Sequence, residues 1–166
     1  MNIRRARESD AAELTRIAHE AKRHWGYPER WIELWRDDLT LTPEFIAGNE
    51  VYLAEDGGEA LGCCALVAGT PSWALEHFWV RPAAMGKGLG RRLFEHARAV
   101  AETAGASVLE IDSDPNAEPF YLKMGAVRVG EVRSQVDGQP RVHPLLRLPL
   151  GETPRPRTPG VSVPTD

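Results

Sequence analysis

The stretch that decides the fold is "VRPAAMGKGLGRRLFEHA", residues 80–97. Three glycines alternate at Gly86, Gly88 and Gly90, and the residues that follow have the apolar spacing of a helix. Glycine permits tight turns and lets a ligand approach the backbone closely. The pattern therefore predicts a tight loop that leads from a strand directly into a helix.

Three cations, Lys87, Arg91 and Arg92, stand at the start of this predicted helix. A helix N-terminus is already partly positive, so cations there are unfavourable unless an anion binds beside them. The loop is not a Walker loop, because the motif G-x-x-x-x-G-K-[S/T] is absent. It is not a dinucleotide fingerprint either, because Arg91 occupies the place of the third glycine. We expect a phosphate-binding loop, and the alternative is a glycine turn that binds no ligand.

The flanking segments indicate an α+β domain. Alternating or continuous apolar runs predict strands near residues 2–6, 51–56, 60–69, 72–80, 107–113, 126–134 and 141–150. Helical spacing predicts helices near residues 9–25, 28–38, 42–48, 89–104 and 116–125. We expect residues 1–150 to form a single domain, with a mostly antiparallel mixed sheet of about seven strands flanked by helices. The Pro-rich residues 151–166 are predicted to be a disordered tail.

Composition narrows the class of protein. The 166 residues carry a formal net charge of −4, which gives no argument for nucleic acid or an anionic membrane as partner. Cys63 and Cys64 are adjacent on a predicted strand, so they point to opposite faces and are expected to be buried thiols. No apolar run approaches the ~18 residues of a membrane helix, and the histidines lack metal-ligand spacing. These features predict a cytoplasmic protein without a bound metal.

The loop resembles the acyl-coenzyme A loop of the GNAT superfamily of N-acetyltransferases, whose signature is R/Q-x-x-G-x-G/A. Gly88 and Gly90 match its glycines, whereas Met85 stands where the family usually has Arg or Gln. A second segment, "DPNAEPFYLKMGA" at residues 114–126, resembles the family's following signature. Asn116, Phe120, Tyr121 and Gly125 hold the corresponding positions of that signature. Ala126 stands where the signature has an aromatic residue.

The resemblance implies direct transfer of acetyl from acetyl-CoA, the cosubstrate, to a primary amine of a small molecule or a protein in a ternary complex. A non-catalytic sensor domain that binds coenzyme A or acyl-CoA on the same fold is the alternative. A third hypothesis is a domain that binds nucleic acid through this basic loop, and the net charge of −4 argues against it.

The resemblance also implies roles in holding the cofactor. The backbone amides of the loop would bind the pyrophosphate, and the edge of the strand ending at Val80 would pair with the pantetheine arm. The expected cofactor-binding residues are Phe78, Trp79, Val80, Met85, Gly86, Lys87, Gly88, Leu89, Gly90, Arg91, Asn116 and Phe120.

Two residues are candidates for proton transfer. Tyr121 matches the family's general acid, and the alternative is an aromatic residue that only packs. An alkyl ammonium, with a pKa near 10.4, must lose a proton before it attacks. Glu76 is the preferred general base, and the alternative is a solvated strand residue with water as the base.

The resemblance implies that the first two helices and the segment between them line the acceptor site. Trp25 and Tyr27 interrupt the helical pattern there, and with His77 they are the predicted substrate-binding residues. Trp31 and Trp35 share a helix face and are expected to belong to the core. The sequence does not identify the acceptor amine, and both a monomer and a homodimer are consistent with it.

Overall fold

The computed structural model describes residues 1–151, so nearly all of the tail predicted at 151–166 lies outside the described residues. The strands are β1 (Asn2–Arg5), β2 (Glu50–Asp56), β3 (Glu59–Val67), β4 (Ser72–Val80), β5 (Val108–Asp112), β6 (Val127–Val136) and β7 (Gln139–Pro149). The α-helices are α1 (Ala11–His24), α2 (Glu29–Leu34), α3 (Pro43–Gly48), α4 (Leu89–Thr103) and α5 (Glu118–Lys123). Short 3-10 helices precede α1 at Glu8–Asp10 (η1) and α4 at Pro82–Ala84 (η2).

All seven strands form one sheet in the order β1-β2-β3-β4-β5-β7-β6. Within it β4 and β5 are parallel, and every other neighbouring pair is antiparallel. The predicted α+β fold with a mostly antiparallel mixed sheet is therefore confirmed. Among the helices of the described part, none has the length and apolar character needed to cross a bilayer.

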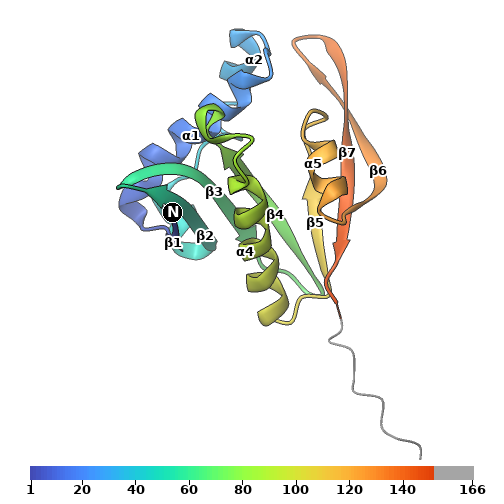
Figure 1. Cartoon of the computed structure of the whole chain (residues 1–166). Coiled ribbons are helices and arrows are strands. Elements are labelled where there is room, and N and C mark those ends of the chain that lie inside the picture. The colour runs from blue at the N-terminus through green and yellow to red at the C-terminus, as the bar shows by residue number, and fades with distance from the viewer. Residues whose placement is uncertain (152–166) are drawn as a thin grey trace, which may run out of the picture.

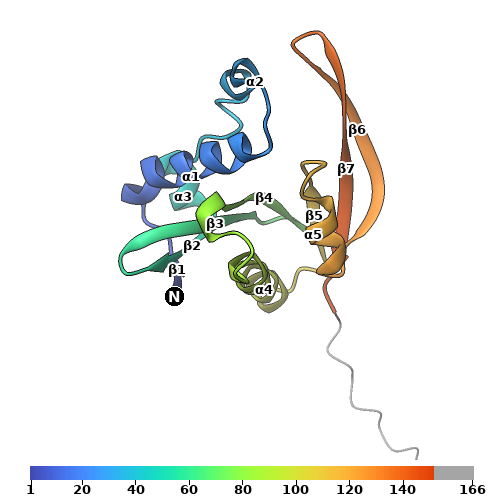
Figure 2. The ribbon, with the colours of Figure 1, turned by 45° about the horizontal axis from the view of Figure 1, so that its top comes forward.

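Helices cover both faces of the sheet. In Figure 2, α1 and α3 lie on one face of β2 and β3, and α4 lies on the other. Each face carries its own cluster of buried apolar residues, one that includes Leu93, Phe94 and Leu146 and one that includes Leu14, Ile17 and Ile32. We call these two sides of the molecule the α4 side and the α1 side.

The central strand β3 contributes to both clusters. Cys64 belongs to the α4-side cluster and Cys63 to the α1-side cluster, and both thiols are free and buried. The expectation of two buried thiols on opposite faces is thus confirmed. Burial in apolar surroundings raises the pKa of both thiols, so they stay protonated at neutral pH.

The pairing of β4 with β5 stops halfway along β4. Ser72–Leu75 pair with Val108–Ile111, and beyond this point β4 runs on as residues 76–80 with β3 as its paired neighbour in the described structure. Figure 1 shows the two strands diverging toward the top of the view. One backbone edge of residues 76–80 is therefore left free for a ligand.

A β-bulge lies where the strands begin to diverge. Ala65 pairs with His77 and Leu66 with Leu75, so Glu76 is the extra residue on β4. A bulge shifts the alternation of side chains. Leu75 and Phe78 consequently pack on the α4 side, although three positions separate them.

Candidate active site

The glycine loop adopts a conformation that favours glycine. Gly86 and Gly88 have φ values of +75° and +81°, and Gly88 is the N-cap of α4. A Cβ atom at either position would meet no atom within 4 Å, so the space beside the loop is open. The first amides of α4 have no partner within the helix. The loop thus offers unpaired donors that an anion can reach.

A cavity of about 550 Å³ extends from this loop along the free edge of β4 to α5. The predicted residues that line it are Trp25, Glu76, Phe78, Trp79, Val80, Met85, Gly86, Gly88, Gly90, Arg91, Asn116, Phe120 and Tyr121. The fold therefore brings together three segments that the sequence singled out separately. Asp112 and Asp114, which the sequence analysis did not select, also contribute to the wall.

Four predicted site residues lie outside this cavity wall. Leu89 is buried in the α4-side cluster, and the exposed side chain of Lys87 does not line the cavity. Tyr27 and His77 are also absent from the wall, because each packs against neighbours on the α1 side.

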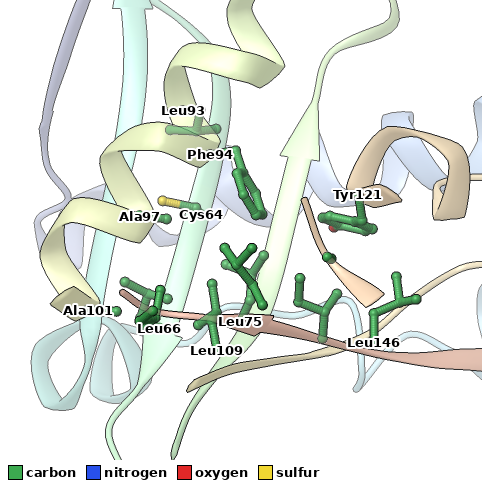
Figure 3. Packing of buried hydrophobic residues seen from close by; sticks show 14 of the residues in the cluster. Cys64, Leu66, Leu75, Leu93, Phe94, Ala97, Ala101, Leu109, Tyr121 and Leu146 are labelled. Carbon is green, nitrogen blue, oxygen red and sulfur yellow. The ribbon is translucent and has the colours of Figure 1, made fainter. Parts of the chain in front are cut away.

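An aromatic cluster closes the floor of the cavity. Phe78 stacks on Phe120 with ring centroids 5.5 Å apart, and Phe94 meets Phe120 edge to face at 5.9 Å. Figure 3 shows Phe94, on α4, and Tyr121, on α5, whose rings lie 5.9 Å apart. A Cβ at Gly90 would lie 3.5 Å from the Phe120 ring, an ordinary van der Waals contact, so α4 and α5 approach each other closely at this point.

Tyr121 is 6% exposed but contributes to the cavity wall. Burial, together with the charge of Asp114, raises the pKa of its phenol well above the ordinary value. The hydroxyl therefore stays protonated at neutral pH and can act only as a proton donor or a neutral hydrogen-bonding group.

Glu76 is exposed and lines the cavity at the bulge where β4 leaves β5. Asp112 lies on the neighbouring strand and pairs with His143, with Oδ1 and Nε2 2.6 Å apart. The cavity wall therefore carries carboxylates at the end opposite to the glycine loop.

His77 is held in its neutral form. The indole Nε1 of Trp79 donates a hydrogen bond to His77 Nδ1 at 3.0 Å, and Phe45 packs against the ring at 5.5 Å. Burial lowers the pKa of His77 to about 4. Residues 1–151 contain no cluster of three or more His, Cys, Asp or Glu side chains arranged to hold a metal ion.

Tyr27 belongs to a buried charged cluster that the sequence analysis missed. Its hydroxyl donates to Asp114 at 2.9 Å, and Lys22 and Arg141 also contact this carboxylate. Trp25, by contrast, is 38% exposed and lines the cavity. No local pattern marks the cluster, because 92 positions separate Lys22 from Asp114 and 27 separate Asp114 from Arg141.

The cavity fits a ligand with a phosphate group and an amide-bearing arm. Its volume lies within the usual range for small-molecule sites, about 300–1,000 Å³. The open loop amides suit an anion, and the unpaired edge of residues 76–80 suits an extended chain of amide groups. The residues present therefore fit a coenzyme A thioester.

Comparison with known proteins agrees with a cavity that fits a coenzyme A thioester. The family profile described as "Acetyltransferase (GNAT) domain" matches residues 47–125. The peptidyl-lysine N-acetyltransferase YjaB of Salmonella typhimurium is 29% identical over 139 residues, covering 72% of this chain and 89% of that protein.

Solved structures share the fold at low sequence identity. The GCN5-related N-acetyltransferase from Rhodopseudomonas palustris superposes with a TM-score of 0.73 at 22% identity, covering 90% of this chain and 95% of that one. YncA from Salmonella typhimurium, solved with its cofactor acetyl-CoA, gives a TM-score of 0.67 at 22% identity, covering 94% and 97% of the two chains. The mixed sheet of this chain thus has the fold of these solved N-acetyltransferases. Residues 47–125 of this chain are thus similar to the GNAT acetyltransferase domain, and the chain is also similar to a peptidyl-lysine N-acetyltransferase.

Proposed function

We propose that this protein transfers the acetyl group of acetyl-CoA to a primary amine by direct transfer in a ternary complex. The observation that carries the proposal is the single cavity that joins the glycine loop, the free edge of β4 and Tyr121. The similarity to YjaB, a peptidyl-lysine N-acetyltransferase, makes a lysine side chain of a peptide the first acceptor to test.

The chain's own groups have separate roles in binding. Backbone amides from Gly86 to Arg91 would hold the pyrophosphate, and the exposed side chain of Arg91 adds positive charge beside it. The free backbone edge of residues 76–80 would pair with the pantetheine arm as an added strand would. Acetyl-CoA would supply the acetyl group as a thioester: the amine nitrogen forms a bond to the carbonyl carbon, the C–S bond breaks, and coenzyme A leaves as the thiolate without an acyl-enzyme.

Tyr121 is the proposed proton donor to the sulfur that leaves. Proton transfer from a phenol with a raised pKa to a thiolate is unfavourable, because the pKa of an ordinary thiol is only about 8.5. The same apolar surroundings also raise the pKa of a thiol, which narrows the difference between the two groups. Tyr121 therefore suits a sulfur that is itself desolvated beside the stacked rings of Phe78 and Phe120.

Glu76 is the proposed acceptor of the proton from the substrate ammonium. It is exposed, ionisable and placed at the end of the cavity away from the glycine loop. An ammonium near this carboxylate can transfer its proton directly or through one water molecule.

The test is an amine panel that follows release of free thiol from acetyl-CoA. The panel contains lysine peptides, diamines and amino acids, and the protein's own buried thiols, Cys63 and Cys64, keep the background low. We expect thiol release that depends on both acetyl-CoA and one class of amine, with the acetylated amine identified by mass spectrometry.

A thermal-shift measurement with acetyl-CoA separates the alternatives. Ligand at 100 times its Kd stabilises a protein by about 2.7 kcal/mol. A rise in Tm without turnover on any amine would indicate a sensor domain. No rise at millimolar acetyl-CoA would disprove the assignment of the cavity.

A further inference from the structure

The two walls of the cleft are not joined by strand pairing, because β4 and β5 stop pairing at Leu75 and Ile111. Some other contact must hold α1, on one side of the opening, at a fixed distance from α5, on the other. We propose that Asp114 is the positioning residue that makes this link. The inference rests on the proposed function, since it concerns the geometry in which the amine meets the acetyl donor.

Donors from two distant parts of the chain converge on the Asp114 carboxylate. Lys22 Nζ, on α1, donates to Oδ2 at 2.6 Å. The Tyr27 hydroxyl, in the turn after α1, donates to the same oxygen at 2.9 Å. Arg141 Nη2, on β7, contacts it at 3.3 Å. One side chain thus connects α1 and the turn that follows it to the C-terminal strands.

The other oxygen of Asp114 shapes the loop that leads into α5. The backbone N–H of Asn116 donates to Oδ1 at 2.8 Å, and the side-chain Nδ2 of Asn116 donates to it at 2.9 Å. Asn116 Nδ2 also donates to the Tyr27 hydroxyl oxygen at 3.1 Å. Asp114 and Asn116 both line the cavity, and α5 with Tyr121 begins two residues after Asn116. A change at the carboxylate would therefore disturb both the acceptor side and the Tyr121 side, and with them the distance between the two.

The link is buried and ionic. The side chains of Asp114, Lys22 and Arg141 are 9%, 11% and 12% exposed. The Lys22 and Arg141 cations lie 4.5 and 4.7 Å from the centre of the Trp35 ring. The electrostatic attraction of the ring face stabilises their positive charges. Burial opposes ionisation of Asp114, but attraction to Lys22 and the hydrogen bonds from Lys22, Asn116 and Tyr27 hold its pKa below the ordinary value. The carboxylate is thus charged at neutral pH.

A second ion pair bridges the same gap but is weaker. Arg30, on α2, pairs with Asp137, in the turn between β6 and β7, at 2.9 Å, and the Arg30 side chain is 74% exposed. Solvent screens exposed pairs, which contribute little to rigidity. Asp114 therefore provides the stronger connection across the opening.

The chain offers a matched control for Asp114→Asn. Asp10 also accepts two bonds from an arginine, Arg4, at 2.9 and 3.0 Å, and one from a backbone N–H, that of Arg7, at 2.7 Å. Asp10 does not line the cavity, and its side chain is 19% exposed. Asp114→Asn and Asp10→Asn both replace a paired carboxylate by an amide of the same shape, and both should lower Tm.

Kinetics then separate positioning from general stability. At a temperature where both variants are folded, we expect Asp114→Asn to lower kcat at least about tenfold and to raise the acceptor KM, because small misplacements of reacting groups cost this much or more. The Kd for coenzyme A should change less than about threefold, since the loop amides are intact. Asp10→Asn should keep kcat and KM within about twofold of the wild type. Equal losses in both variants, or none in Asp114→Asn, would overturn the proposal.

A distance measurement tests, independently of catalytic activity, whether Asp114 fixes the separation of α1 and α5. Spin labels on His24→Cys, at the exposed end of α1, and Lys123→Cys, on exposed α5, report the separation of the two walls. The native thiols are buried and are not labelled. Asp114→Asn should broaden the distance distribution and Asp10→Asn should not, whereas identical distributions in all three proteins would refute the link. A wild type that acetylates no amine would remove the proposed function, and the distances would still test Asp114.

If Asp114→Asn does not fold, Arg141→Gln takes its place. It removes one cation and leaves the Lys22–Asp114 pair, so it should cause a smaller change in the same direction. An Arg141→Gln protein with wild-type kinetics and wild-type distances would also refute the link.

Discussion

The two sides of the sheet stabilise the cleft by different means. On the α4 side, hydrocarbon and aromatic groups pack around Phe94, and the loop contributes backbone amides rather than side chains. On the α1 side an apolar cluster is accompanied by buried polar groups, Lys22 and His77. Packing is non-directional, whereas a buried charge needs partners at defined positions. We expect the α4 side to tolerate a change of shape poorly and the α1 side to tolerate a change of charge poorly.

The largest effect on stability is expected on the α4 side. Phe94 is completely buried and meets Phe78 and Phe120 edge to face. Phe94→Ala should lower the free energy of unfolding by about 3–5 kcal/mol, because it leaves a cavity and removes aromatic contacts. Urea denaturation measures the loss. Glu95→Ala, at the exposed neighbouring position, should change stability by less than about 0.5 kcal/mol, and equal losses would contradict the packing argument.

Tyr121→Phe separates chemistry from packing on the same side. The ring stays in its aromatic cluster and only the hydroxyl is lost. We expect kcat to fall by about 10²-fold while Tm and the Kd for coenzyme A remain close to the wild type. Steady-state kinetics and calorimetry measure the three quantities.

Tyr52→Phe is the control for this change. Tyr52 is part-buried, and its hydroxyl donates to Glu50, away from the cavity wall. Its kcat should stay within about twofold of the wild type. Full activity in Tyr121→Phe would remove Tyr121 from the mechanism.

The α4 side was the more predictable part of the molecule. Strand β4, the glycine loop and α4 follow one another in the chain, so period and glycine spacing within residues 72–105 suffice to place them. The seven strands were likewise indicated by local patterns. The start of α3, predicted near residue 42, is also fixed locally, because the Thr42 side chain accepts a hydrogen bond from the Phe45 N–H at 3.0 Å.

The α1 side was less predictable because its polar groups pair across long stretches of sequence. The importance of Lys22 depends on Asp114, 92 positions away, and nothing near Lys22 distinguishes it from the other basic residues of α1. His77 was expected near the substrate, but the bulge at Glu76 and the bond from Trp79 place it among α1-side residues. A strand pattern cannot reveal a bulge when both possible registers bury apolar side chains.

The charge sensitivity of the α1 side should appear in the pH dependence of stability. His77 titrates near pH 4 in the folded protein and near its ordinary pKa of about 6.5 when unfolded. Between these values the unfolded chain binds more protons, so stability falls as the pH falls. From pH 7 to pH 5 the His77 contribution should decrease by about 2 kcal/mol.

The variant His77→Gln isolates this contribution. A glutamine can still accept the hydrogen bond from Trp79, but it does not titrate. Urea denaturation of both proteins at pH 7 and pH 5 should show a pH dependence that is smaller by about 2 kcal/mol in the variant. Identical slopes would show that His77 is protonated without cost in the folded state.

The smallest effect concerns the loop on the α4 side, where Gly88→Ala adds one methyl group. A Cβ at Gly88 meets no atom, so any cost comes from the φ of +81° alone, about 1 kcal/mol or a little more. In a domain of this size 1 kcal/mol corresponds to a fall in Tm of about 2–4 °C. Acetyl-CoA binding should weaken as well, because the strained loop turns its amides away from the pyrophosphate.

Gly48→Ala gives the opposite sign and tests the explanation. Gly48 ends α3 with ordinary helical geometry, and a Cβ there also meets nothing. Alanine at a compatible glycine position stabilises by about 0.4–1 kcal/mol through the unfolded state, so Tm should rise. Both variants add the same methyl group to open space, and only the sign of φ differs between their positions. If both raised Tm, the loop would not need glycine at position 88, and the anion-binding conformation on the α4 side would lose its backbone argument.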